Sequence, residues 1–282
     1  MEPLTLDLNR TSFQWNTKDE VPNIHDWFLM SSPMPVAGIM ISYWLFVLKL
    51  GPMYMKSRDP VQVTKYLVVY NIFQVFVSFY IAIAVINCMR TYGVFPSICP
   101  GDPVERKSLL VRSCHTFLLA KITELLDTIF FVLKKNGRQV TFLHVYHHSM
   151  VVIVTWIALK MDSVYPSATF IGGINALVHA VMYTYYGLSA FPSMAKYLWW
   201  KKYITTLQLA QFFTIMAHHY VSFRMAKCDK IDIFFLATIF HLFLFVYLFL
   251  DFYIKTYMKN INKKTDPGNS SKCNGKNKIK HN

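Results

Sequence analysis

His144, His147 and His148 lie in one short segment with the sequence His-Val-Tyr-His-His. Their i, i+3 and i+4 spacing places the three imidazoles on one side of an α-helix. A single histidine in an apolar segment is usually a hydrogen-bonded core residue, which is our interpretation of His115 and His241. Three on one face instead indicate a site, because neutral imidazole can act as a nucleophile, a general base or a metal ligand.

A second cluster precedes the histidines and consists of Lys121, Glu124, Asp127 and Thr128. On a helix these residues fall within about 120° of one face. Ionisable groups at bilayer depth cost about 2.5–3.5 kcal/mol each, so a membrane segment keeps them for function or pairs them internally. Lys121 and Glu124 have the spacing of an ion pair, which accounts for two of the four residues without a catalytic role. Asp127 then needs another partner.

Two later segments carry further polar stripes. The first holds Asn175, His179, Met182, Tyr183 and Tyr186, and the second holds Thr205, Gln208 and Gln211, followed by His218 and His219. These residues either contribute to the same site or form hydrogen bonds between helices, which are worth about 0.6–2 kcal/mol per contact in membranes.

A metal site is one interpretation of the histidine segment, which locally resembles the histidine boxes of iron-dependent membrane desaturases and hydroxylases. Such enzymes need several boxes, whereas this chain has one, and the side chains of adjacent His218 and His219 diverge by about 100° on a helix. The five cysteines show no C-x-x-C spacing. We therefore expect neither a metal nor an organic cofactor.

The elements that position these residues follow from composition. The chain has 282 residues, of which 54% are hydrophobic and 16% charged. This is more apolar than an ordinary soluble domain and predicts a multi-pass membrane protein. The net charge of +14 then indicates basic cytosolic loops beside an anionic leaflet rather than nucleic-acid binding.

Apolar runs predict an all-α fold with seven transmembrane helices. The spans are expected near Met34–Leu50, Tyr66–Ile86, Leu109–Leu133, Phe142–Leu159, Ser167–Ala190, Tyr203–Phe223 and Ile231–Ile254. Residues 1–33 would form an N-terminal tail, residues 34–254 a membrane domain, and residues 255–282 a disordered, lysine-rich tail.

The predicted orientation has a lumenal N-terminus and a cytosolic C-terminus. Lys and Arg concentrate in the loops after the first, third and fifth spans and in the C-terminal tail. Asn9 begins a glycosylation sequon on the lumenal side. Cys99 and Cys228 both fall in lumenal loops, where they are either disulfide-bonded, as we predict, or two free thiols. Lys278 and Lys280 resemble a dilysine retrieval signal for the endoplasmic reticulum.

Four sequence blocks, in this order, resemble the family of very-long-chain fatty acid elongases, the membrane 3-ketoacyl-CoA synthases. The blocks are Lys-Ile-Thr-Glu-Leu-Leu-Asp-Thr at residues 121–128, the histidine box at 144–148, His-Ala-Val-Met-Tyr-Thr-Tyr-Tyr at 179–186, and Thr-Thr-Leu-Gln-Leu-Ala-Gln at 205–211. Each block lies on a separate predicted span, and the resemblance extends over essentially the whole chain.

The resemblance implies condensation of a long-chain acyl-CoA with malonyl-CoA, with loss of carbon dioxide. Our hypothesis makes His147 the nucleophile that carries the acyl group, with His144, His148 and His179 as base, enolate stabiliser or positioning groups. Lys121, Glu124 and Asp127 would orient the histidines. Asn175, Tyr183, Gln208 and Gln211 would donate hydrogen bonds to substrate, although structural support is an equal interpretation for each.

Separate regions are expected to bind the CoA and acyl parts of the substrate. Basic loop residues would attract CoA phosphates or face the anionic leaflet: Lys134, Lys135, Arg138, Lys201 and Lys202. The acyl tail would lie in an apolar tunnel between the spans. Implied partners are membrane lipids, a ketoacyl-CoA reductase and other elongation-cycle enzymes, and a second copy of the chain. The alternatives are a histidine-box iron desaturase or hydroxylase and a seven-span receptor or transporter.

Overall fold

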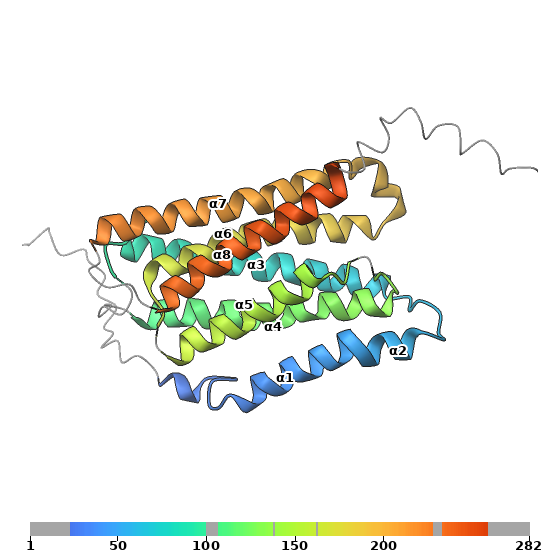
Figure 1. Cartoon of the computed structure of the whole chain (residues 1–282), viewed down its shortest axis with the longest axis horizontal. Helices are drawn as coiled ribbons and strands as arrows, with labels where there is room; N and C mark the ends of the chain where they lie inside the picture. Colours follow the sequence, from blue (N-terminus) through green and yellow to red (C-terminus); the bar gives the residue numbers. More distant parts are fainter. Residues whose placement is uncertain (1–22, 100–106, 138, 162, 228–232, 259–282) are drawn as a thin grey trace, which may run out of the picture.

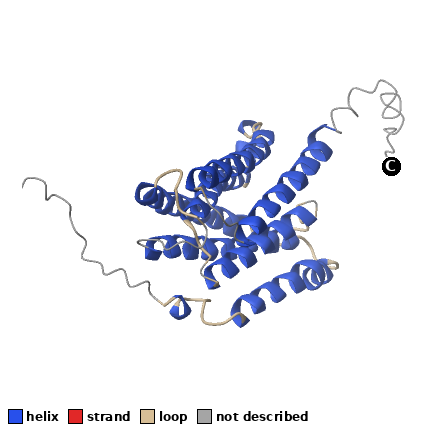
Figure 2. Cartoon of the chain, turned by 60° about the vertical axis from the view of Figure 1, so that its left-hand side comes forward, coloured by secondary structure: helices blue, strands red, loops and turns tan. Residues whose placement is uncertain are grey.

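The computed structural model describes residues 23–99, 107–137, 139–161, 163–227 and 233–258. Within these ranges every regular element is a helix, in agreement with the expected all-α fold (Figure 2). Some predicted features lie outside the described residues: Asn9, Arg138, Cys228, Lys278 and Lys280, with most of both tails.

Each of the seven predicted spans corresponds to a helical rod in the described part of the chain. The first rod joins α1 (Met34–Leu45), a π-helical turn (Phe46–Leu50) and α2 (Gly51–Met55). The others are α3 (Thr64–Tyr92), α4 (Lys107–Leu133), α5 (Phe142–Lys160), α6 (Pro166–Ser189), α7 (Lys201–Ala226) and α8 (Ile233–Tyr253), which continues as a π-helical turn (Ile254–Met258). Short 3-10 turns cover Ile24–Asp26 and Pro192–Tyr197. The predicted boundaries were too narrow in places, since α3 continues to Tyr92 rather than ending near Ile86.

Local sequence signals set where several helices begin. Pro166 is the first residue of α6, where its missing N–H costs no hydrogen bond. Thr141 caps α5 by accepting a hydrogen bond of 3.2 Å from the backbone N–H of His144. This cap places the histidine box in the first turns of α5.

Among the described residues, four stretches of helix are long and apolar enough to cross a membrane. They are Met34–Met55, Thr64–Tyr92, Phe142–Lys160 and Phe235–Thr256. Large apolar side chains such as Phe76 and Phe240 are more than 60% exposed on the outer surface. An outer surface of this kind is suited to lipid, and the chain is a membrane protein.

The helices pack side by side along one long axis (Figure 1). The most extensive packing joins α3 to α6, and α4 contacts both α5 and α6. Gly173 makes the α3–α6 approach possible, because a Cβ atom there would lie only 2.6 Å from Cγ1 of Val85. This packing places α4 and α6 in the interior of the bundle, together with the polar residues that they carry.

Candidate active site

The centre of the site is a buried ion pair on α4. Nζ of Lys121 lies 2.8 and 2.9 Å from the two carboxylate oxygens of Glu124. Both side chains are buried. The predicted i, i+3 ion pair is therefore confirmed.

His179 of α6 joins this pair. Its Nδ1 lies 3.1 Å from Oε1 of Glu124 and 3.4 Å from Nζ of Lys121. A carboxylate only accepts hydrogen bonds, so we assign the ring proton to Nδ1, which donates to Glu124. Nε2 of a neutral His179 then carries a free lone pair, as a base or nucleophile requires.

Asp127 finds its partner on α6. The hydroxyl of Tyr183 donates a hydrogen bond of 2.7 Å to Oδ2 of Asp127. Both residues are buried. The Tyr183 hydroxyl proton is thus held by Asp127, and the predicted role of Tyr183 as a donor to substrate stays a prediction.

A polar stripe on α3 is not among the site residues that the sequence predicts. Gln74 is buried and its Nε2 donates to Oη of Tyr70 at 2.9 Å and to Oγ1 of Thr123 at 3.0 Å. The Tyr70 ring meets the Tyr183 ring edge-on, with centroids 6.0 Å apart. Polar residues at i and i+4 in an apolar span were the available signal, since that spacing puts both on one face. Gln74 and Tyr70 thus support the Asp127–Tyr183 pair from α3.

The three histidines of the box face different neighbours. Nε2 of His144 lies 2.9 Å from Oγ1 of Thr128 on α4. The ring of His148 lies between the other two, with centroids 4.4 Å from His144 and 5.3 Å from His147. The His147 ring instead meets Phe245 of α8 at 5.1 Å. The spacing predicted a shared face, but only His147 points toward α8.

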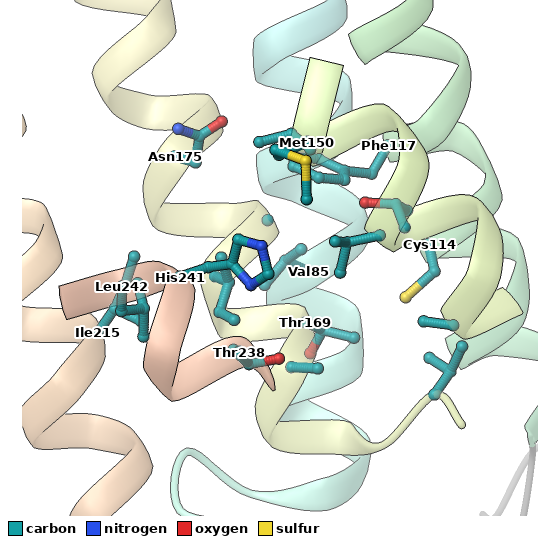
Figure 3. A pocket seen from close by; sticks show the side chains of 18 of the residues that line it. Val85, Cys114, Phe117, Met150, Thr169, Asn175, Ile215, Thr238, His241 and Leu242 are labelled. Carbon is teal, nitrogen blue, oxygen red and sulfur yellow. The ribbon is translucent and has the colours of Figure 1, made fainter. Parts of the chain in front are cut away.

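A largely apolar cavity of about 180 Å³ has His147 among its lining residues. Its wall is drawn from six helices, α3 to α8, and Figure 3 shows lining residues such as Met150, Phe117 and Leu242. On α5 the lining positions run from His147 to Ala158, which corresponds to roughly 16 Å along the helix axis. The cavity wall therefore extends far enough along α5 to suit an extended apolar chain.

Two amide side chains line this cavity. Asn175 and Gln211 both line it, and their side-chain oxygens Oδ1 and Oε1 are buried without a hydrogen-bond partner among the described residues. Unpartnered buried polar atoms are rare and call for an explanation such as a ligand. By contrast, Nε2 of Gln208 makes only a 3.7 Å contact to Sδ of Met182.

The predicted CoA-binding lysines lie at the end of the bundle where α5 begins. Lys134 and Lys135 follow the end of α4, Lys201 and Lys202 start α7, and all four are exposed. We call this the basic end. The fifth predicted residue, Arg138, lies outside the described residues.

The opposite end holds groups that do not join the site. Nε2 of His218 lies 2.6 Å from the carbonyl oxygen of Val94, and its ring stacks on Phe170 with centroids 3.8 Å apart. Cys99 is disulfide-bonded, and its Sγ lies 3.8 Å from the carbonyl oxygen of Ala226. The predicted partner Cys228 lies outside the described residues, so that pairing stays a prediction.

Within the described ranges, no three His, Cys, Asp or Glu side chains are grouped as metal ligands would be. His144 contacts Thr128, and the His147 ring meets Phe245. The expectation that the enzyme uses no metal remains a prediction.

Comparison with known proteins gives consistent matches. The model of the ELO family, described as the GNS1/SUR4 family, matches residues 28–265. The chain is 38% identical to very long chain fatty acid elongase 7 of Rattus norvegicus over 248 residues, covering 86% of this chain and 87% of that protein. It is 37% identical to very long chain fatty acid elongase 4 of Homo sapiens, covering 87% and 78% respectively. Very long chain fatty acid elongase 1 of Homo sapiens is 38% identical, with coverage of 77% and 78%.

Proposed function

The chain belongs to the ELO (GNS1/SUR4) family and is an enzyme of fatty acid elongation, and we propose that it catalyses the condensation step. In this reaction a long-chain acyl-CoA and malonyl-CoA give a 3-ketoacyl-CoA two carbons longer, with release of carbon dioxide and CoA. The observation that carries this proposal is the position of His147 at the start of a long apolar cavity.

The first half-reaction transfers the acyl group to His147. A ring nitrogen attacks the thioester carbonyl carbon, the C–S bond breaks, and the other ring nitrogen loses its proton to the departing CoA thiolate. The product is a neutral acyl-imidazole. Covalent catalysis of this type divides one difficult step into two easier ones.

The second half-reaction uses malonyl-CoA. Its C–C bond to the carboxylate breaks, carbon dioxide leaves, and the resulting enolate carbon attacks the acyl carbon. The C–N bond to His147 then breaks, and the departing imidazolate takes up one proton from water, which is the proton that the net reaction consumes. The developing enolate oxygen needs donors, and the amide NH2 groups of Asn175 and Gln211 are suited to this role by their place beside the cavity.

His179 is suited to proton transfer or enolate stabilisation. Its Nδ1 is held by Glu124, and Lys121 in turn neutralises Glu124. Asn175, which lines the cavity, lies one helical turn from His179 on α6. Lys121 and Glu124 are therefore positioning residues in this proposal, and His179 is the group that acts on substrate.

The acyl chain would occupy the cavity as a tunnel, with the CoA moiety at the basic end. Lysine ammonium groups attract phosphates, although the same residues are also suited to an anionic leaflet. Both roles place the basic end in the cytosol, with the C-terminus there and the N-terminus in the lumen of the endoplasmic reticulum.

All seven rods are proposed to cross the membrane. The three that are less apolar, α4, α6 and α7, contain 27, 24 and 26 residues. At 1.5 Å per residue each exceeds the roughly 30 Å hydrocarbon core. Many of their polar residues, such as Glu124, His179 and Gln211, are buried, so that contact with other helices replaces contact with lipid.

The experiment for the reaction class is carbon dioxide release from labelled malonyl-CoA by membranes that contain the chain. Release that depends on added acyl-CoA, with a 3-ketoacyl-CoA product, supports condensation. No release with any acyl-CoA, from folded protein, contradicts it. Neither an iron oxygenase nor a seven-span receptor or transporter is favoured by the family match.

A further inference from the structure

His241 of α8 extends into the cavity, where Figure 3 shows its ring among the lining side chains. Its Nδ1 lies 2.7 Å from the carbonyl oxygen of Ala237 on the same helix. A carbonyl oxygen only accepts hydrogen bonds, so Nδ1 carries the ring proton. Nε2 of the neutral ring is then an acceptor, and no described residue pairs with it.

Other polar groups of the cavity wall also use their protons elsewhere. The hydroxyl of Thr169 donates to the carbonyl oxygen of Pro166 at 2.7 Å, and that of Ser113 donates to the carbonyl oxygen of Leu109 at 2.9 Å. Both residues line the same cavity as His241. Apart from the amide NH2 groups of Asn175 and Gln211, these wall residues offer lone pairs, which suit a ligand that brings a hydrogen-bond donor.

The position of His241 along the cavity defines where that donor would be. Phe245, whose ring lies 5.1 Å from that of His147, comes four residues after His241 on α8. Four residues correspond to roughly 6 Å along the helix axis. An acyl chain that starts at His147 would pass Phe245 and then reach His241, so the donor would be on the chain and not on the thioester.

A wholly apolar chain would leave Nε2 of His241 without a partner, which is unfavourable in an apolar site. A hydroxyl at the same depth would pair with it. We propose that the cavity accepts acyl-CoAs with a mid-chain hydroxyl group, which donates a hydrogen bond to Nε2 of His241, and that His241 is a specificity-determining residue. This inference rests on the proposed acyl-CoA condensation.

The test compares octadecanoyl-CoA with positional isomers of hydroxyoctadecanoyl-CoA in competition. We expect the wild type to use one mid-chain isomer best. His241→Phe keeps the ring shape but removes the acceptor, and should lower the kcat/KM ratio of that isomer to octadecanoyl-CoA by about tenfold or more. His241→Gln restores an acceptor and should recover part of the ratio. Phe240→Leu, on the 64% exposed neighbour, is the matched control and should leave the ratio unchanged.

Two results would overturn the inference. One is a ratio that is the same in His241→Phe as in the wild type, and the other is rejection of every hydroxylated isomer by the wild type. If His241→Phe does not fold, the same kcat/KM ratio is measured for His241→Leu, and the preference of the wild type among the positional isomers provides the second test. If octadecanoyl-CoA itself gives no product, the proposed condensation fails, and competition of the isomers for bound labelled acyl-CoA still tests the role of His241.

Discussion

The hydroxyl of Tyr183 donates a hydrogen bond of 2.7 Å to Asp127, joining α6 to α4 inside the bundle. The carboxylate of Glu124, one turn before Asp127, contacts Lys121 and His179 instead. The two neighbouring carboxylates thus have separate partners. Glu124 pairs with the cationic Lys121, and Asp127 accepts from the neutral hydroxyl of Tyr183. This division keeps the two groups in place beside the histidines.

Replacing Tyr183 with Phe should destabilise the fold, because it leaves Asp127 buried without its donor. The expected cost is about 1–3 kcal/mol. The measurement is the unfolding temperature of detergent-purified protein. Tyr247→Phe on the lipid-facing surface is the control, since Tyr247 is 66% exposed. Equal unfolding temperatures for the two variants would contradict the structural role of the Tyr183 hydrogen bond.

Lys121→Met should reduce both folding and activity, because the Glu124 carboxylate stays buried without its cation. Breaking a buried ion pair costs about 3–5 kcal/mol. The double variant Lys121→Met, Glu124→Gln removes both charges and should recover folding without recovering full activity. The amount of monodisperse protein and its turnover are measured side by side. A well-folded, fully active Lys121→Met would argue against the positioning role.

Gly173→Ala should weaken the packing of α3 on α6, since the added Cβ would approach Cγ1 of Val85 to 2.6 Å. Overpacking of this kind costs about 1–3 kcal/mol. Val85→Ala in the same chain should relieve it. Gly38→Ala is the matched control, because a Cβ there meets nothing within 4 Å. The prediction fails if Gly173→Ala and Gly38→Ala unfold at the same temperature.

Ala158→Phe should shift the products toward shorter chains. Ala158 lines the cavity roughly 16 Å along α5 from His147, so a larger side chain shortens the available space. Product chain lengths are measured by mass spectrometry after incubation with a mixture of acyl-CoAs. Ile157→Phe, next to it and outside the cavity wall, is the control. An unchanged product distribution for Ala158→Phe would show that the acyl chain does not occupy this cavity.

Much of the fold could be predicted from the sequence, because each rod carries its own apolar run and some helices, such as α5 and α6, begin at a capping residue or a proline. The Lys121–Glu124 pair could also be predicted, since both residues lie on one helix and their spacing sets the distance. The partner of Asp127 could not, because Tyr183 lies on another helix and the contact depends on how two helices are rotated against each other.

The same limit applies to the histidines. Spacing places three imidazoles on one side of α5, but it does not show that His147 faces the cavity while His144 contacts Thr128. His241 was interpreted as a core residue, and it does bond to its own helix at Nδ1. That its other nitrogen faces the cavity depends on the packing of α8 against its neighbours, which one sequence does not specify.

The most direct test of the proposed mechanism is to trap the acyl group on the protein. Purified protein is incubated with labelled acyl-CoA without malonyl-CoA, digested, and examined by mass spectrometry. The mechanism predicts the acyl mass on the peptide and the residue of His147, no label in His147→Ala, and discharge of the label into a 3-ketoacyl-CoA when malonyl-CoA is added. Full turnover by His147→Ala, or a label on another residue that malonyl-CoA discharges, would contradict it.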